Sequence, residues 1–420
     1  MKKWQRTVLF WVLCFVFLII SPILILYSQG YRFDFEKRTF VKTGGLFIKA
    51  QPKQVEVFLN GKFVKKTDLF FGSLLIQKLL PKKYKIEVKK EGFSSWEKNL
   101  EIQPNKVTEA KNIILFPKKI DLEKLVSFVE DFYPLADKKR IILKEKSEEG
   151  WMLSLYDIEK NFTTLLVKEK TFSRDGANLI NLEETENQNV LKIEVGFGEK
   201  MKIFSLDFSQ IPPILKEEEE KVENFLAQKK LEKNVYYLDS FGNLFLNQEK
   251  INQEPLPIQK ETKYSIEVLN GNIFIKESKN ENESCFYLFN NENKNFEKIF
   301  CGGKDFKISP DGKKLAIFSN SEIWILFLKD ELGQPQKKAG EKFLLLRLSK
   351  EIKDVFWINS NYLIFNSGGE IQIAEIDDRD KINVVTFEGF KDPKIFWNSL
   401  DKRIYILDEE KFFRTQSFLF

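Results

Sequence analysis

The last three quarters of the chain repeats one short pattern, and this repetition limits the fold more than any other feature of the sequence. In its clearest copy, SPDGKKLAIFSNSEIWIL, a polar turn precedes two apolar runs. The residue types of the turn match the four positions of a type I turn in order: Ser309, Pro310, Asp311 and Gly312. We therefore interpret these residues as a structural turn and not as a reactive site, and we expect Lys313 and Lys314 after it to remain in solvent.

Related turn-and-strand units recur between residues 118 and 420. An alignment of Asp137, Asp175, Asp311, Ser360 and Asp401 gives spacings of 38, 136, 49 and 41 residues. A period of ~40–45 residues with four short strands per unit is typical of a β-propeller. The region 118–420 therefore predicts a propeller of about seven blades. Its SPDGKKLAIF turn resembles the WD-type repeats of TolB-like propellers, although the other copies keep only parts of the motif.

One segment of this region departs from the strand pattern. Residues 215–233 begin with acidic residues, end with basic residues and place Val222, Phe225 and Leu226 at helical spacing. Such a charge distribution complements the helix dipole. We predict an inserted helix over 215–233, which either packs between blades or binds a partner.

Residues 45–117 predict a small β-sandwich. Short alternating strands are separated by turn residues, and Asn60-Gly61 is a strong hairpin signal because a type I′ turn needs positive φ at both central positions. In YKIEVKK, the residues Tyr84, Ile86 and Val88 share one face of a strand. The order of these strands and turns resembles the PEGA domain family, with Pro52-Lys53-Gln54-Val55 in place of its naming motif. This resemblance implies an Ig-like interaction or spacer module without catalytic residues.

The N-terminus carries an apolar run from Val8 to Tyr27, which contains 20 residues and no charge. At ~1.5 Å per residue, this length spans a bilayer core of ~30 Å. We interpret residues 1–30 as a cytoplasmic tip and transmembrane signal anchor in the lipid bilayer, followed by a linker over 31–44. A cleaved signal peptide is the alternative, but the run lacks the small residues of a cleavage site. Basic residues flank both ends, and we expect the N-terminus inside and the rest of the chain outside the cytoplasm.

Two of the three cysteines lie in a second predicted hairpin. Cys285 and Cys301 are equally distant from Asn293 in an Asn-rich turn, so the two strands place them opposite each other. They are candidates for a disulfide, and two buried free thiols are the alternative. A disulfide is compatible with an oxidising exterior.

Composition restricts the chemistry. The chain contains no histidine, which excludes Ser-His-Asp and Cys-His catalysis and zinc sites that need histidine. Residues 1–42 and 43–117 carry net charges of +5 and +7, whereas residues 118–420 carry −7. The basic part suits anionic headgroups or wall polymers, or is an ordinary solvated surface. Its lysines are spread out, and we expect no binding of nucleic acid.

One tight acidic cluster, Asp377 to Asp380, lacks the spacing of a calcium loop, and we interpret it as a solvated turn. No phosphate-binding loop or metal-ligand pattern stands out, so we expect no cofactor and no metal. The sequence thus predicts an all-β protein with an N-terminal transmembrane helix. Its expected function is that of a surface-exposed, non-catalytic binding or scaffold protein with an envelope protein or glycan as partner. The alternative is an extracytoplasmic propeller enzyme that cleaves envelope glycans with paired carboxylates.

Overall fold

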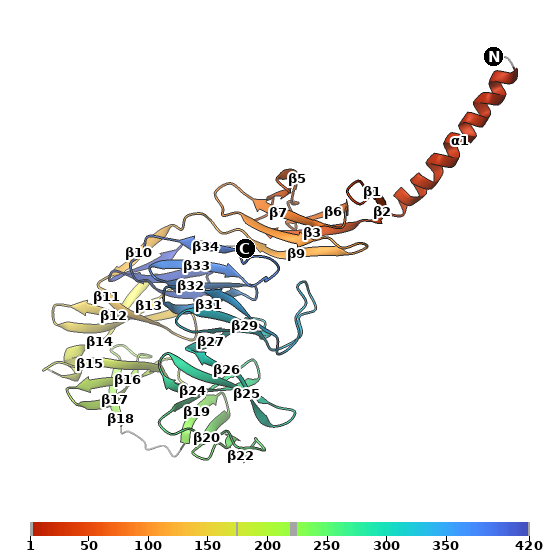
Figure 1. Ribbon diagram of the computed structural model, residues 1–420. Coiled ribbons are helices and arrows are strands. Elements are labelled where there is room, and N and C mark those ends of the chain that lie inside the picture. Colours follow the sequence, from red (N-terminus) through yellow and green to blue (C-terminus); the bar gives the residue numbers. More distant parts are fainter. Residues whose placement is uncertain (1–2, 174, 219–224, 419–420) are drawn as a thin grey trace.

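The computed structural model describes residues 3–173, 175–218 and 225–418. A long helix, α1 (Lys3–Ser28), projects from the body of the molecule, and nearly all other elements are strands (Figure 1). Over the described ranges, α1 is the one helix that is long and apolar enough to cross a membrane. The most apolar window within Trp4–Ser28 has a mean hydropathy of 3.0, and none of it is buried. This helix is therefore a candidate membrane anchor or signal sequence.

Residues expected to form a linker after the helix form a hairpin instead. Strand β1 (Tyr31–Asp34) pairs antiparallel with β2 (Thr39–Lys42). The carboxylate of Asp34 accepts hydrogen bonds from the backbone N–H groups of Glu36 and Lys37, at 2.9 and 3.2 Å, and so closes the turn. An Asp side chain that accepts hydrogen bonds from the backbone of its own turn stabilises the turn. The two strands have only four residues each, too few for an alternation of apolar and polar residues to predict them.

A β-sandwich follows. Its strands are β3 (Gly44–Gln51), β4 (Glu56–Leu59), β5 (Lys62–Lys66), β6 (Ser73–Leu79), β7 (Lys83–Lys89), β8 (Trp96–Glu101) and β9 (Val107–Ile114). One sheet has the order β6-β3-β9 and the other β5-β4-β7-β8. Strand β9 lies at an edge and runs parallel to β3, while the other neighbouring strands are antiparallel.

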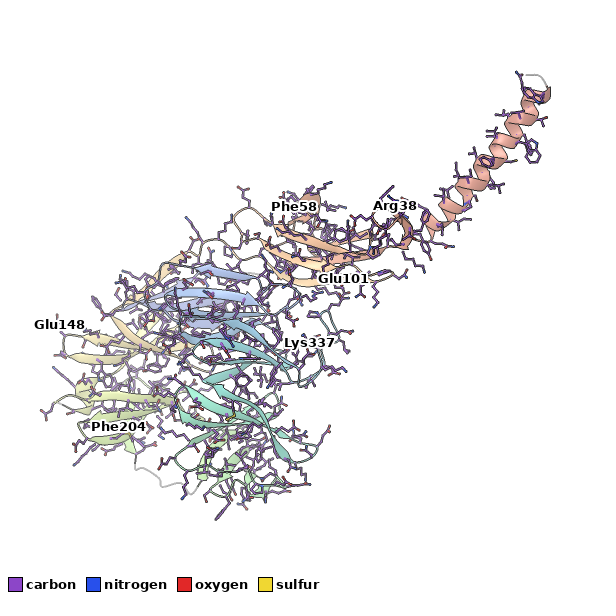
Figure 2. The ribbon with its side chains drawn as sticks, viewed as in Figure 1. Arg38, Phe58, Glu101, Glu148, Phe204 and Lys337 are labelled. Carbon is purple, nitrogen blue, oxygen red and sulfur yellow. A yellow bond between two sulfur atoms is a disulfide. The ribbon has the colours of Figure 1, made fainter. Side chains whose placement is uncertain are left out.

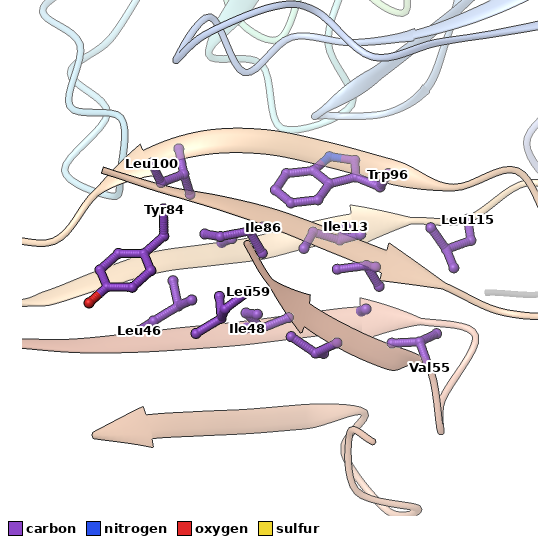
Figure 3. Packing of buried hydrophobic residues seen from close by; sticks show 14 of the residues in the cluster. Leu46, Ile48, Val55, Leu59, Tyr84, Ile86, Trp96, Leu100, Ile113 and Leu115 are labelled. Carbon is purple, nitrogen blue, oxygen red and sulfur yellow. The ribbon is translucent and has the colours of Figure 1, made fainter. Parts of the chain in front are cut away.

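Alternating apolar residues of both sheets form the core of the sandwich, as Figure 3 shows for Ile48, Ile86 and Trp96. The predicted alternation in β7 is confirmed, with Tyr84, Ile86 and Val88 buried. The predicted turn at Asn60-Gly61 is also confirmed, because both residues have positive φ, 50° and 76°, between β4 and β5.

The rest of the described chain forms seven four-stranded antiparallel sheets. The first sheet contains β11 (Val129–Pro134), β12 (Arg140–Ser147), β13 (Gly150–Asp157) and β14 (Phe162–Lys168), and a short helix, α2 (Glu169–Phe172), follows it. The second contains β15 (Asn178–Glu184), β16 (Val190–Phe197), β17 (Lys200–Asp207) and β18 (Ile214–Glu218). The third contains β19 (Phe225–Leu231), β20 (Asn234–Asp239), β21 (Leu244–Leu246) and β22 (Glu249–Lys250).

The fourth sheet contains β23 (Lys263–Leu269), β24 (Asn272–Asn280), β25 (Glu283–Asn290) and β26 (Asn295–Gly303). The fifth contains β27 (Asp305–Ile308), β28 (Lys314–Phe318), β29 (Glu322–Phe327) and β30 (Lys342–Arg347). The sixth contains β31 (Ile352–Asn359), β32 (Tyr362–Ser367), β33 (Glu370–Glu375) and β34 (Val384–Phe387). The seventh joins β35 (Lys394–Asn398), β36 (Arg403–Asp408) and β37 (Lys411–Thr415) to β10 (Leu122–Ser127), which comes from the start of the region.

Hydrophobic clusters join most pairs of neighbouring sheets in the region. Shared clusters connect the first sheet with the second, the third with the fourth, and then each sheet with the next up to the seventh. A further cluster joins the seventh sheet to the first, through Tyr405, Phe412 and Phe132. The chain therefore returns to its starting point, as in a propeller-like fold, and the pairing of β10 with β37 ties the two ends of the region together.

The structure corrects the prediction for residues 215–233. Residues 214–218 lie in β18, residues 225–231 lie in β19 and residues 232–233 form a turn, so the described part of this segment is not helical. Residues 219–224 lie outside the described residues. Strand pairing with β17 and β20 outweighs the helical spacing of the sequence. The repeat alignment needs one correction as well. Asp175 lies between two sheets, before β15, whereas Asp137, Asp311, Ser360 and Asp401 each lie between the first and second strands of a sheet.

Candidate binding site at the sandwich–propeller junction

The sandwich and the propeller-like region meet around one buried ion pair. The Lys98 side chain of β8 has no exposed surface, and its Nζ lies 2.6 Å from Oε1 of Glu375 at the end of β33. The same Nζ donates to the carbonyls of Asp377 and Lys381, at 2.6 and 2.8 Å. All three ammonium donors are therefore satisfied by the propeller-like region, so this buried side chain has no donor without a partner.

The partner carboxylate is equally well satisfied. Oε2 of Glu375 accepts a hydrogen bond of 2.7 Å from the indole Nε1 of Trp96, whose ring packs in the sandwich core (Figure 3). Oε1 also accepts from the backbone N–H and the side-chain amide of Asn383, at 3.1 and 2.6 Å. A carboxylate bound from both domains fixes their relative position, because any movement at the junction leaves buried polar groups without partners.

The acidic cluster at Asp377 to Asp380 belongs to this junction, which corrects its interpretation as a solvated turn. Asp377 forms an ion pair of 2.6 Å with Arg379, and Arg379 donates to the carbonyl of Glu109 in β9, at 2.9 Å. Oδ2 of Asp380 accepts from the backbone N–H and the side-chain amide of Asn99, at 2.8 and 3.0 Å. Among the described residues, no group of three or more His, Cys, Asp or Glu side chains is arranged to hold a metal ion.

Side chains of the propeller-like region also cap the free edge of β9. The side-chain amide of Gln334, in the loop between β29 and β30, accepts from the Glu109 N–H at 2.9 Å and donates to the Val107 carbonyl at 3.0 Å. The Tyr362 hydroxyl accepts from the Ile114 N–H at 3.0 Å. Figure 2 shows this junction between the labelled residues Glu101 on the sandwich and Lys337 on the β29–β30 loop. These contacts protect an edge strand that would otherwise be open to pairing.

A cavity of about 360 Å³ lies beside β9, and Gln334 and Tyr362, which bind the edge of that strand, are among its lining residues. Its wall on the sandwich side is the β9 segment from Glu109 to Ile113, and its wall on the other side includes Phe327, Glu331 and Tyr362. Burial raises the pKa of the Tyr362 hydroxyl well above its ordinary value, so this group stays neutral. The cavity is thus lined by both aromatic and charged side chains, and its volume lies in the range of small-ligand sites.

The predicted turn at Ser309 to Gly312 borders the same cavity. The Gly312 N–H donates to the Ser309 carbonyl at 2.8 Å, and the buried Ser309 hydroxyl accepts from the Lys314 N–H at 3.0 Å. Pro310 takes the second turn position, and Gly312 has a φ of 68°. The turn also connects neighbouring sheets, because the Asp311 N–H donates to the Ser360 hydroxyl at 3.2 Å. These contacts explain the turn as a structural element.

One expectation for this turn was wrong. Lys314 does not remain in solvent: its side chain is buried, and its Nζ lies 2.8 Å from Oδ2 of Asp311 and 3.6 Å from Oε2 of Glu331. Burial raises the pKa of the Asp311 carboxyl, but hydrogen bonds from Lys314, Ser309 and the Lys313 N–H outweigh burial and lower it to about 2. The two cavity carboxylates nearest the turn are therefore bound to a buried cation, while Lys313 is half-buried and lines the cavity.

The junction residues were missed from the sequence, although one signal was present. In WEKNLE, period-two alternation places Lys98 on the same face as the buried residues Trp96 and Leu100. A lysine at an inward position needs an acidic partner. Residues 43–117 are net basic and residues 118–420 are net acidic, which favours a partner in the second region. The partner itself lies 277 positions along the chain, and nothing local to Glu375 identifies it.

The two cysteines of the fourth sheet lie far from the junction in sequence and are joined to each other. Cys285 in β25 pairs with Cys301 in β26, their Cα atoms are 4.1 Å apart, and their sulfur atoms form a disulfide. The sequence left a disulfide and two buried free thiols as alternatives for Cys285 and Cys301, and the structure contains the disulfide. The remaining cysteine, Cys14, lies in α1 as a free thiol.

Comparisons with known proteins give one family match for part of the chain and distant structural likenesses. Residues 43–114 match the PEGA domain family. No curated protein matches the sequence. Among solved structures, the Cps50 (Swd1) β-propeller domain of Myceliophteria thermophila has 11% identity and a TM-score of 0.45, over 71% of this chain and 100% of that one. The protein YCF48, solved with a D1 peptide, has 12% identity and a TM-score of 0.42, over 71% of this chain and 96% of that one. The description as propeller-like rests on the strand order and the shared clusters.

Proposed function

We propose that this chain is a single-pass membrane-anchored, surface-exposed binding or scaffold protein without catalytic activity. Helix α1 spans the bilayer through Val8 to Tyr27, and the sandwich and propeller lie outside the cytoplasm. Each of the seven sheets is one blade. The partner is a protein or glycan of the cell envelope.

The observation that carries this proposal is the locked junction and its cavity. Because Lys98 and Glu375 are buried together, the sandwich cannot swing freely relative to the propeller. The cavity between them therefore keeps a fixed position relative to the sandwich, which is joined to the membrane helix through the β1–β2 hairpin. A preformed cavity on a rigid arm suits capture of an envelope partner, since little conformational entropy is lost when the partner binds.

Two further observations support the membrane location. No part of the apolar window of α1 is buried, so lipid is the environment that removes its side chains from water. The disulfide between Cys285 and Cys301 is of a kind that persists in oxidising compartments and is rare in the cytosol. Together they favour an N-terminus in the cytoplasm and a body outside it.

The cavity chemistry favours binding over hydrolysis of glycans. A glycosidase needs one carboxylic acid with a raised pKa to protonate the leaving group. The Asp311 carboxyl has a pKa lowered to about 2, and Glu331 shares its Lys314 partner. A carboxylate such as Asp311, held in the charged form by a buried lysine, can recognise a partner but is a poor proton donor.

Site-specific photocrosslinking in intact cells tests the proposed binding site. A photoreactive phenylalanine replaces Asn112, which lies in the cavity wall, and in a control chain it replaces Asn282, in the turn between β24 and β25. We expect one discrete crosslinked envelope component from position 112 and none from position 282. Identical crosslinking from both positions would contradict a site at the junction, and turnover of wall polymers by the purified chain would contradict a non-catalytic role.

Protease accessibility tests the topology. External protease should digest the sandwich and propeller in intact cells from which the outer barriers have been removed. Digestion that requires lysis of the cell membrane would show that the body lies in the cytoplasm, and the proposed location would then be wrong.

A further inference from the structure

We propose that the β1–β2 hairpin (Tyr31–Lys42) is a second lipid-contacting element, which lies in the headgroup layer of the same bilayer that α1 crosses. This inference rests on the proposed membrane anchor and adds a surface that fixes how the sandwich sits on the membrane. The occupant we assign to this surface is anionic phospholipid.

The first observation is position. The hairpin starts three residues after α1 ends at Ser28, and Figure 1 shows it beside the sandwich-side end of the helix. The Arg32 guanidinium stacks over the Tyr27 ring at 3.3 Å and donates to the Tyr27 carbonyl at 3.0 Å. Thr43 closes the open end of the hairpin, because its N–H and its hydroxyl both donate to the Gly30 carbonyl, at 3.0 and 2.8 Å. The hairpin is thus fixed to the residue that marks the boundary of the apolar run.

The second observation is an exposed aromatic cluster on one face. Phe33 pairs with Phe40 across the strands, and their ring centroids are 5.3 Å apart. Phe35, in the turn, contacts Phe33 at 5.1 Å. The exposed fractions of Phe33, Phe35 and Phe40 are 38%, 83% and 43%, so rings that contact one another still present much of their surface outward. The opposite face holds the buried Asp34, which points inward and closes the turn.

The third observation is the charge around these rings. Period-two alternation places Lys42 on the same face as Phe40, and Lys37 and Arg38 lie in the turn beside Phe35. Across the described chain, neither Lys37 nor Arg38 forms an ion pair. Figure 2 shows Arg38 at the end of the sandwich from which α1 departs. Aromatic rings interleaved with unpaired cations, held level with the end of a membrane helix, match the composition of an interfacial element that binds anionic headgroups.

Spin-label accessibility measured on the full-length chain in lipid nanodiscs tests this inference. The label is attached at Phe35→Cys in a Cys14→Ser background, with Phe40→Cys as a second position in case the first variant folds poorly. The matched control is Phe241→Cys, because Phe241 is 78% exposed and lies in the turn between β20 and β21, at the end of the molecule away from α1 (Figure 1). The disulfide is left oxidised, so that only the introduced thiol reacts.

We expect the label at residue 35 to be several-fold more accessible to oxygen, which concentrates in lipid, than to a water-soluble relaxant. The label at residue 241 should show the reverse. Phosphatidylglycerol should deepen the position of residue 35 relative to phosphatidylcholine alone, and the variant Lys37→Glu with Arg38→Glu should abolish this difference. Equal accessibility at residues 35 and 241, or dipolar broadening from a second copy at residue 35, would overturn the proposal.

A label on native Cys14 separates this inference from the anchor on which it rests. Cys14 lies within the apolar run of α1. Immersion of Cys14 together with exposure of residue 35 would overturn the lipid contact of the hairpin alone. Exposure of both labels to water would overturn the membrane anchor as well.

Discussion

Removal of the buried lysine at the junction should weaken the protein more than removal of a comparable surface lysine. In Lys98→Met the aliphatic part of the side chain is retained, but Glu375 loses a contact of 2.6 Å and the carbonyls of Asp377 and Lys381 lose their donor. An uncompensated buried charge of this kind costs about 3–5 kcal/mol. We expect the value near 3 kcal/mol, because Trp96 and Asn383 still donate to the Glu375 carboxylate.

The matched control is Lys85→Met. Lys85 also forms ion pairs with two glutamates, at 2.8 and 3.1 Å, but its side chain is 47% exposed, so solvent screens these pairs and their loss should change the free energy of unfolding little. Urea unfolding of the full chain, followed by intrinsic fluorescence, gives the free energy of unfolding of both variants. Hydrogen exchange in β9 reports whether the junction opens first, since its edge caps depend on the contact between the two domains.

The double variant Lys98→Met with Glu375→Gln completes a thermodynamic cycle. Removing both charges should recover part of the loss, with a coupling energy of about 1–3 kcal/mol between the two positions. The reasoning would be refuted if Lys98→Met cost no more than Lys85→Met, or if the coupling energy were zero.

Two other predictions concern the turn and the disulfide. The Asp311 pKa of about 2 lies below its ordinary value of 3.8, so the stabilisation it provides is present above pH ~4 and lost as the pH falls toward ~2. Asp311→Asn should remove this part of the acid sensitivity in pH-dependent unfolding, and an unchanged profile would contradict the ion pair with Lys314. Replacing Cys285 and Cys301, 16 residues apart, with serine should lower stability by about 3 kcal/mol, measured by thermal unfolding. Cys14→Ser serves as the control, and an equal loss there would argue against a structural disulfide.

Features that depend on neighbouring residues could be predicted from the sequence. The Asn60-Gly61 turn needs only the backbone freedom of two residues, and both have positive φ. The pairing of Cys285 with Cys301 followed from symmetry about Asn293. In the structure the turn is centred slightly earlier, and a register shift between Phe286 and Tyr287 restores the pairing. A β-bulge thus compensated for an error in the assumed turn position.

Features that depend on distant residues could not be predicted. Residues 215–233 have helical spacing, but β18 and β19 extend because β17 and β20 provide strand partners. The cluster at Asp377 to Asp380 looks free of partners until Asn99 and Glu109 of the sandwich are placed beside it. In each case the decisive neighbour lies on another element, and its identity is not written in the local pattern.

The buried pair at the junction also sets an order of events during synthesis. Trp96 and Glu375 are 279 residues apart in the sequence. Because chains grow at about 5–20 residues per second, Glu375 is synthesised about 15–60 s after Trp96. Over that interval Lys98 stays hydrated and the edge of β9 lacks its caps, while α1 has already left the ribosome. The sandwich is therefore an early module attached to its helix, and its final position is set only when one of the last sheets of the chain is made.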